Sequence, residues 1–270
     1  MNKIKKQIII LQLMALIIGG YGCEMKKEKV KQEPTLNEWQ KEFLAEQGLP
    51  TEYSELNLTQ QLSVDAIYEM IMYLEEKYGI GFEYTGYVRP QILEKEYMTA
   101  IPEGGNAKTD TVTVTREDDG TFTDDYPNIA VRPYYEQMVT DYVKDYFNSD
   151  KIKVFSTVTK TTIKDLSNIN EKSMKSNVYG VNCIFIENSI CTLEEFKTFI
   201  TEYAEWSKEY GCASTNRIML FFNGNISGLN PDGSPIVFDK DYYGKEHLAA
   251  RYMCYVEKNG EIQISEREIR

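Results

Sequence analysis

The chain of 270 residues contains one histidine, His247, and the residues before it are acidic. A histidine beside carboxylates such as Asp239 and Asp241 has the chemistry of a general base, because its pKa lies near neutral pH. Catalysis would also need a nucleophile and a cleft. The sequence contains no Gly-x-Ser-x-Gly elbow, phosphate-binding glycine loop or His-Glu-x-x-His helix. We therefore expect His247 to be a surface residue.

His247 ends the segment 223–247, which is rich in glycine and asparagine and is predicted to be a loop. A loop of this length is unusual within a compact domain, and long loops are often functional. Tyrosine combines an apolar ring with a polar tip, which suits a binding surface. The segment therefore predicts a recognition surface that is aromatic and acidic, formed by Asp239, Asp241, Tyr242, Tyr243 and His247.

The N-terminus has the pattern of an export signal. Three lysines, Lys3, Lys5 and Lys6, precede an apolar run at 8–18, which is shorter than the roughly 20 residues of a membrane-spanning helix. Small residues and Cys23 follow. Residues 1–23 resemble the signal peptides of bacterial lipoproteins of the Gram-positive type, in which such a cysteine receives a diacylglyceryl group and becomes the new N-terminus.

This resemblance implies removal of residues 1–22, lipid attachment at Cys23 and a location on the extracytoplasmic face of the cell membrane. Two alternatives stay open from the residues alone: cleavage nearby without lipid, and an uncleaved membrane anchor. Residues 23–35 are rich in lysine and glutamate, which predicts a solvated tether between the membrane and a folded body.

The charge of the chain limits its partners. The formal charge is −12, and loss of residues 1–22, which hold three lysines and no acid, lowers it to −15. Nucleic-acid binding depends on lysine and arginine neutralising phosphates, so a nucleic-acid partner is not expected. An acidic surface serves solubility. It also suits a cationic protein or peptide partner, and the 20 tyrosines of the chain provide interface residues.

Five cysteines are present, and assigning Cys23 to lipid leaves an even set of four. Disulfides are possible outside the cytoplasm. Cys183 and Cys254 both lie in predicted strands, so this pair is the candidate disulfide, with free buried thiols as the alternative. The scattered spacing of the cysteines argues against a zinc site, and we expect no metal and no cofactor.

Local patterns predict an α+β fold with antiparallel sheet packed by amphipathic helices. Thr35 and Glu38 have the spacing of a capping box, as do Thr192 and Glu195, and Pro133 is expected to open a helix. Helices are expected at 64–78 and 193–210, and hairpin turns at 119–120 and 259–260.

The expected organisation is a signal peptide at 1–22, a tether at 23–35, an N-terminal α+β half at 36–165 and a C-terminal α+β half at 166–270, which may form one continuous domain. The two halves share the order helix, strand, loop and hairpin. The leading hypothesis is a membrane-anchored extracytoplasmic lipoprotein that binds a protein or peptide at the cell envelope. The alternative is an extracytoplasmic enzyme that acts on envelope material without a recognisable motif.

Overall fold

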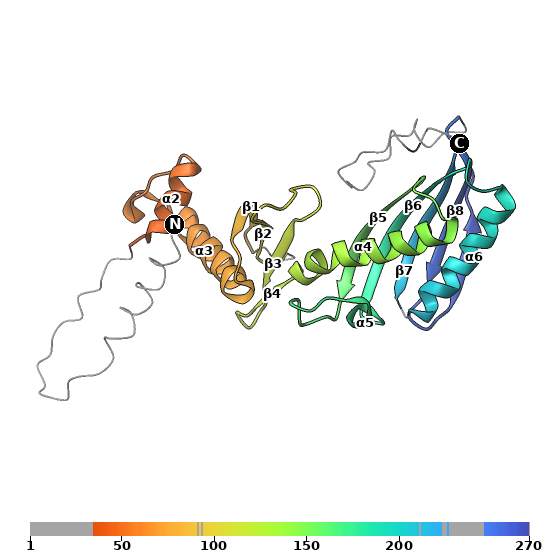
Figure 1. Ribbon diagram of the computed structural model, residues 1–270. Helices are drawn as coiled ribbons and strands as arrows, with labels where there is room; N and C mark the ends of the chain where they lie inside the picture. Colours follow the sequence, from red (N-terminus) through yellow and green to blue (C-terminus); the bar gives the residue numbers. More distant parts are fainter. Residues whose placement is uncertain are drawn as a thin grey trace, which may run out of the picture.

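The computed structural model of the chain describes residues 35–90, 92, 94–210, 212–222, 226 and 246–269 (Figure 1). Cys23, most of the predicted tether, and four residues of the predicted recognition loop, Asp239, Asp241, Tyr242 and Tyr243, lie outside the described residues. Among the helices in the described ranges, none is both long and apolar enough to cross a lipid bilayer.

The N-terminal half is a helical hairpin packed on a four-stranded antiparallel meander of order β1-β2-β3-β4. Helix α3 buries Met70, Ile71 and Leu74 against the sheet, where Met98 and Val114 are also fully buried. The elements are α2 (Glu38–Glu46), η2 (Tyr53–Glu55), α3 (Leu58–Tyr78), β1 (Phe82–Val88), β2 (Tyr97–Pro102), β3 (Val112–Arg116) and β4 (Phe122–Asp124).

The cap of α2 differs from the prediction. Asn37, not Thr35, is the N-cap residue: its side chain accepts a hydrogen bond from the Gln40 amide at 2.9 Å, and the Gln40 side chain accepts one from the Asn37 amide at 3.0 Å. The observed capping box lies two residues after the predicted one, and the helix that begins after Asn37 buries Leu44. The predicted box of Thr192 and Glu195 is confirmed at the start of α6 (Leu193–Glu209).

The C-terminal half is a five-stranded sheet of order β5-β6-β7-β8-β9. Helix α6 connects β6 to β7, and a crossover of this kind makes these two strands parallel, whereas the other three pairs are antiparallel. Helices α4 and α6 cover one face of this sheet (Figure 1). The remaining elements are α4 (Tyr126–Phe147), β5 (Ile152–Thr161), α5 (Glu171–Met174), β6 (Val178–Glu187), β7 (Ala213–Phe221), β8 (Leu248–Val256) and β9 (Ile262–Glu266).

The predicted α+β class is confirmed, but the predicted division at 165 is wrong. Strand β5 pairs with β6 over its whole length, and α4 packs on β5, so both elements belong to the C-terminal half. That half therefore begins at Tyr126. Each half does contain a helix followed by an antiparallel meander, α3 with β1–β4 and α6 with β7–β9, as the sequence pattern suggested. Both predicted hairpin turns are present, with Gly120 and Gly260 at φ +82° and +81°.

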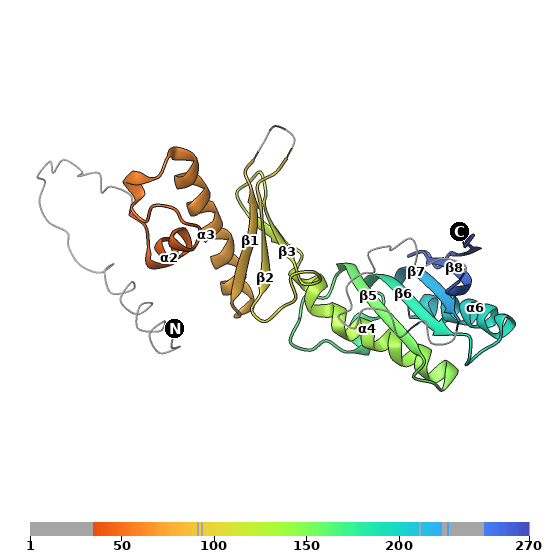
Figure 2. The same cartoon turned by 90° about the horizontal axis from the view of Figure 1, so that it is seen from above.

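Helix α4 joins the two halves, and it starts earlier than predicted. Pro127 occupies the first turn, where a missing N–H costs nothing, while Pro133 lies inside the helix. The first turn stays helical because Tyr126 and Ile129 pack against the N-terminal core. Figure 2 shows α4 running from the edge of the first sheet onto the second.

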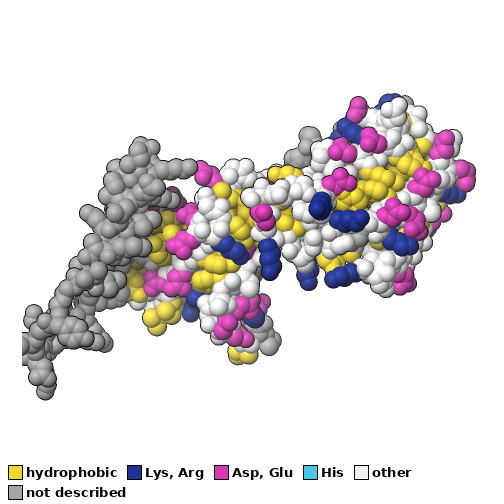
Figure 3. Space-filling view, turned by 60° about the horizontal axis from the view of Figure 1, so that its bottom comes forward, with side chains coloured by type: hydrophobic (Ala, Val, Ile, Leu, Met, Phe, Trp, Pro, Cys, Tyr) yellow, Lys and Arg dark blue, Asp and Glu magenta, His cyan; other side chains and the backbone are white. Residues whose placement is uncertain are grey.

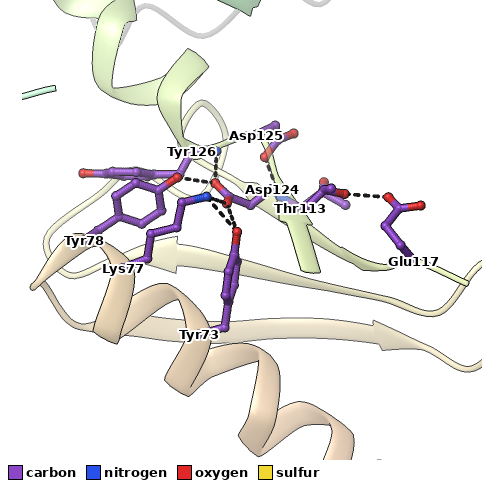
Figure 4. Close-up of polar contacts among 9 residues, drawn as sticks. Tyr73, Lys77, Tyr78, Thr113, Glu117, Asp124, Asp125 and Tyr126 are labelled. Atoms are coloured by element: carbon purple, nitrogen blue, oxygen red, sulfur yellow. Dashed lines mark hydrogen bonds and ion pairs between the residues drawn. The ribbon is translucent and has the colours of Figure 1, made fainter. Parts of the chain in front are cut away.

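Asp124 lies between α3 and the start of α4 and holds the two helices together (Figure 4). Its carboxylate is fully buried and lies 2.6 Å from the Lys77 ammonium group. Tyr73 and Tyr78 of α3 donate hydrogen bonds to its two oxygens at 2.8 and 2.7 Å, and the Tyr126 amide donates a third at 3.1 Å. One carboxylate thus ties the end of α3 to the beginning of α4. Although burial opposes ionisation, these partners lower the pKa of Asp124.

Candidate functional site

The helical face of the C-terminal half carries a groove bounded by α4, α5 and α6. On α4, residues Val131, Tyr135, Val139 and Val143 repeat every four positions and are buried on the sheet. The neighbouring stripe of α4 lies one step around the helix and faces the groove. It comprises Tyr134, Gln137, Met138, Asp141, Tyr142 and Asp145.

The groove has a volume of about 450 Å³ and an aromatic wall. The rings of Tyr142 and Trp206 are stacked, with centroids 4.2 Å apart and planes inclined by 18°. Tyr210 extends this wall beyond Trp206, at 5.4 Å. Met174 of α5 contributes to the lining, and Tyr134 stands half exposed at the rim. An apolar, aromatic surface is therefore open to solvent between three helices.

The rim of the groove is acidic. Asp141 and Asp145 lie one turn apart on α4, and Glu171 faces them from α5. Gln137 donates a hydrogen bond to Asp141 at 2.7 Å, which orients that carboxylate. Within the described residues, none of these three acids forms an ion pair with a lysine or arginine. Figure 3 shows hydrophobic side chains on the C-terminal half with both acidic and basic side chains beside them.

The negative potential extends to α6. Burial raises the pKa of Tyr142 to about 12, and the nearby carboxylates of Glu202 and Glu209 add to the shift. The face of the Tyr142 ring is electron-rich, as in other aromatic side chains. An aromatic wall with an acidic rim attracts cations, because the ring quadrupole and the carboxylates both favour positive charge.

Comparison with known proteins adds little to this geometry. No family model matches the chain, and no curated protein matches it. Among solved structures, a DUF5037 family protein from Ruminococcus gnavus ATCC 29149, determined at 2.55 Å, is similar with a TM-score of 0.33 and 14% sequence identity. The similarity covers 59% of this chain and 76% of that one.

Of the predicted recognition residues, His247 is the one that the structure describes, and it does not line this groove. His247 lies directly before β8, where its backbone carbonyl accepts a hydrogen bond from the Phe222 amide at 2.9 Å. It is half-buried, and it lies at the opposite end of the sheet from the groove, beyond the end of β7. The groove is instead lined by Tyr134, Tyr142 and Trp206, none of which belongs to the predicted loop.

The candidate disulfide between Cys183 and Cys254 is absent, and both cysteines are free thiols. Strand β7 separates β6 from β8, and the register pairs Cys183 with Arg217 and Cys254 with Asn216. Neighbouring residues along a strand point to opposite faces. The two thiols therefore lie on opposite sides of the sheet, which excludes a bridge. Cys191 and Cys212 are free as well.

A buried polar cluster supports the site from beneath. The Asn182 side-chain amide donates hydrogen bonds to the Tyr135 hydroxyl at 2.9 Å and to the Asn216 side-chain carbonyl at 2.8 Å. Tyr203 of α6 donates to the same Asn216 oxygen at 2.9 Å. These bonds fix α4 and α6 over one point of the sheet, and this sets the width of the groove. Across the described ranges, no three His, Cys, Asp or Glu side chains gather closely enough to hold a metal ion.

Proposed function

We propose that this protein is an extracytoplasmic lipoprotein, anchored through Cys23, that binds a cationic protein or peptide in the groove between α4, α5 and α6. The observation that supports this function is the combination of the stacked Tyr142 and Trp206 wall with three acids that form no ion pair in the described part of the chain. Asp141 interacts electrostatically with Lys144 at longer range. The overall charge of −12 favours the same partner through long-range attraction.

The free energies of the individual contacts indicate what kind of ligand binds in the groove. An exposed ion pair contributes up to about 1 kcal/mol, and a cation over an aromatic face contributes about 0.5–2 kcal/mol. One lysine or arginine side chain in the groove therefore gains roughly 3 kcal/mol at most, which corresponds to a dissociation constant of several millimolar. Tighter binding needs several cationic side chains. A peptide or a protein surface meets this requirement, whereas a single ammonium ion does not.

The binding proposal is tested by calorimetry with a ten-residue peptide that alternates lysine and glycine. We expect binding that weakens as salt is added, and no binding of the corresponding glutamate peptide. The variant D141N/D145N/E171Q is expected to weaken binding at least tenfold. The matched control, E38Q/E42Q/E46Q, removes the same charge from the exposed face of α2 and is expected to bind as the natural protein does. Equal weakening by both variants would show attraction by net charge without a site.

The anchor is tested separately by mass spectrometry of the mature N-terminus. We expect a lipid-modified Cys23 as the first residue, and release of the protein from the membrane when Cys23→Ala is expressed. A mature protein that is found unlipidated and released would refute the anchor while leaving the groove proposal intact.

A further inference from the structure

A second pocket, of about 220 Å³, lies on the face of the C-terminal sheet opposite the groove. Gly180 and Ser214 point to the helical side, where Gly180 lies against the ring of Tyr135 and Ser214 contacts Ser207 of α6. Residues alternate along a strand. Their neighbours Tyr179, Ala213 and Thr215 therefore point to the other face, where the pocket is found.

The pocket is a trough over β7 with a tyrosine on each side. Tyr179 stands on β6 and Tyr255 on β8, and β7 between them carries only the small side chains Ala213 and Thr215. Strands lie about 4.8 Å apart, so the two tyrosines are separated by roughly 10 Å of sheet. A gap of this size admits one flat ring or a small branched group. Thr215 and both tyrosines place hydroxyl groups at this trough.

Two lysines lie near the ring of Tyr179, of which Lys258 lines the trough and Lys160 does not. The Lys160 ammonium group lies 6.0 Å from the centre of the Tyr179 ring, and that of Lys258 lies 5.7 Å from it. Lys160 is the register partner of Tyr179 across β5 and β6, whereas Lys258 comes from the turn after β8. In the described part of the chain, neither lysine forms an ion pair. Glu257 is the one acid among the lining residues.

We propose that this trough binds a small organic oxyanion, a carboxylate or phosphate carried on a flat ring, whose charged group lies beside Lys258 and near Lys160 and whose ring lies between Tyr179 and Tyr255. This function is distinct from cation binding in the groove and does not depend on it.

The charges at the trough indicate the chemical class of the ligand. The two ammonium groups lie 6.0 and 5.7 Å from the centre of one ring, and both attract an anion that binds beside Lys258. Charge-assisted hydrogen bonds to a carboxylate or phosphate are stronger than neutral ones, and the hydroxyls of Tyr179 and Thr215 supply further donors. The surrounding chain is strongly acidic, so a local pair of cations without acidic partners selects small anions that reach the pocket, not large polyanions.

The test uses ligand-observed NMR on the full chain with benzoate, phenyl phosphate and the neutral control benzyl alcohol. We expect both anions to bind at millimolar concentration and benzyl alcohol not to bind; the relative affinities of the two anions distinguish carboxylate from phosphate. Lys258→Gln and Lys160→Gln are each expected to weaken binding about fivefold, the size of one exposed charge contact.

Two controls separate this site from the rest of the surface. Lys197→Gln removes a lysine that pairs with Glu194 on α6, and it is expected to leave anion binding unchanged. The groove variant D141N/D145N/E171Q is expected to do the same, so failure of the groove proposal would not affect this result. Equal binding of benzyl alcohol, or unchanged anion binding in Lys258→Gln, would overturn the inference and leave the lysines as simple packing partners of Tyr179.

Discussion

The ring of Tyr142 on α4 lies flat against the indole of Trp206 on α6, with centroids 4.2 Å apart. The contact joins two helices that pack independently on the same sheet, so the aromatic wall of the groove is held from both sides. Surfaces that are ordered before a ligand arrives lose less entropy on binding. This contact therefore orders the groove before a ligand binds, as the proposed cation site requires.

Replacement of Asp124 by Asn is expected to destabilise the N-terminal half by about 2–3 kcal/mol, because it removes the charge that Lys77, Tyr73 and Tyr78 share in a buried position. Urea unfolding monitored by Trp39 fluorescence in a Trp206→Phe background measures this change. The control Asp118→Asn lies in the exposed hairpin turn and is expected to change stability by less than about 0.5 kcal/mol. If Asp124→Asn lowered the free energy of unfolding as little as the control does, the contacts of Asp124 would not stabilise the N-terminal half.

The same carboxylate predicts a pH dependence. The pKa of Asp124 is lower in the folded protein than its ordinary value of 3.8, so its contribution is complete above that value and is lost as the pH falls through the folded pKa. The stability difference between the natural protein and Asp124→Asn is therefore expected to be constant at pH 5–7 and to shrink below about pH 4. Urea titrations across this range measure it, and a difference that stays constant down to pH 2.5 would contradict the assignment.

Gly180 is expected to tolerate no side chain, because a Cβ at this position would lie 2.3 Å from the ring of Tyr135. Gly180→Ala should cost about 1–3 kcal/mol through this overlap. The double variant Gly180→Ala/Tyr135→Leu, which removes the ring, should lose less than the two single variants together. Thermal unfolding followed by circular dichroism provides the three values; strict additivity would mean that the two residues are not in contact.

All four described cysteines are expected to be reduced. Alkylation in denaturant without reductant should modify Cys183, Cys191, Cys212 and Cys254, with the same mass as in a reduced sample. In the native protein the reaction should be slow at Cys212 and Cys254, because burial raises the pKa of each thiol to about 11. Two fewer modifications in the unreduced sample would reveal a bridge that the strand order excludes.

Sequence patterns predicted helix starts and hairpin turns well where a few neighbouring residues determine them. The box of Thr192 and Glu195 marks the start of α6, and Gly120 and Gly260 mark the two hairpin turns, because each of these signals acts within a few residues. The start of α2 was predicted two residues too early, because Thr35 and Glu38 have the spacing of a capping box but Asn37 and Gln40 form the box that caps the helix.

What could not be predicted depends on contacts between distant segments. The α4 pattern does not show which sheet it covers, so the boundary between the halves was placed after β5 and not before α4. The parallel insertion of β7 between β6 and β8, which separates Cys183 from Cys254, follows from the crossover. Tyr142 and Trp206 lie far apart in the chain, and no local pattern in the sequence marks them as parts of one site.

The central claim, that the groove binds cations on its aromatic wall, is tested most directly by the fluorescence of Trp206. In a Trp39→Phe background, which leaves Trp206 as the single indole, titration with the lysine and glycine peptide is expected to give a saturable change in emission. The change should weaken with salt and disappear in D141N/D145N/E171Q. A flat titration, or one that is unaffected by the loss of these three acids, would contradict the account.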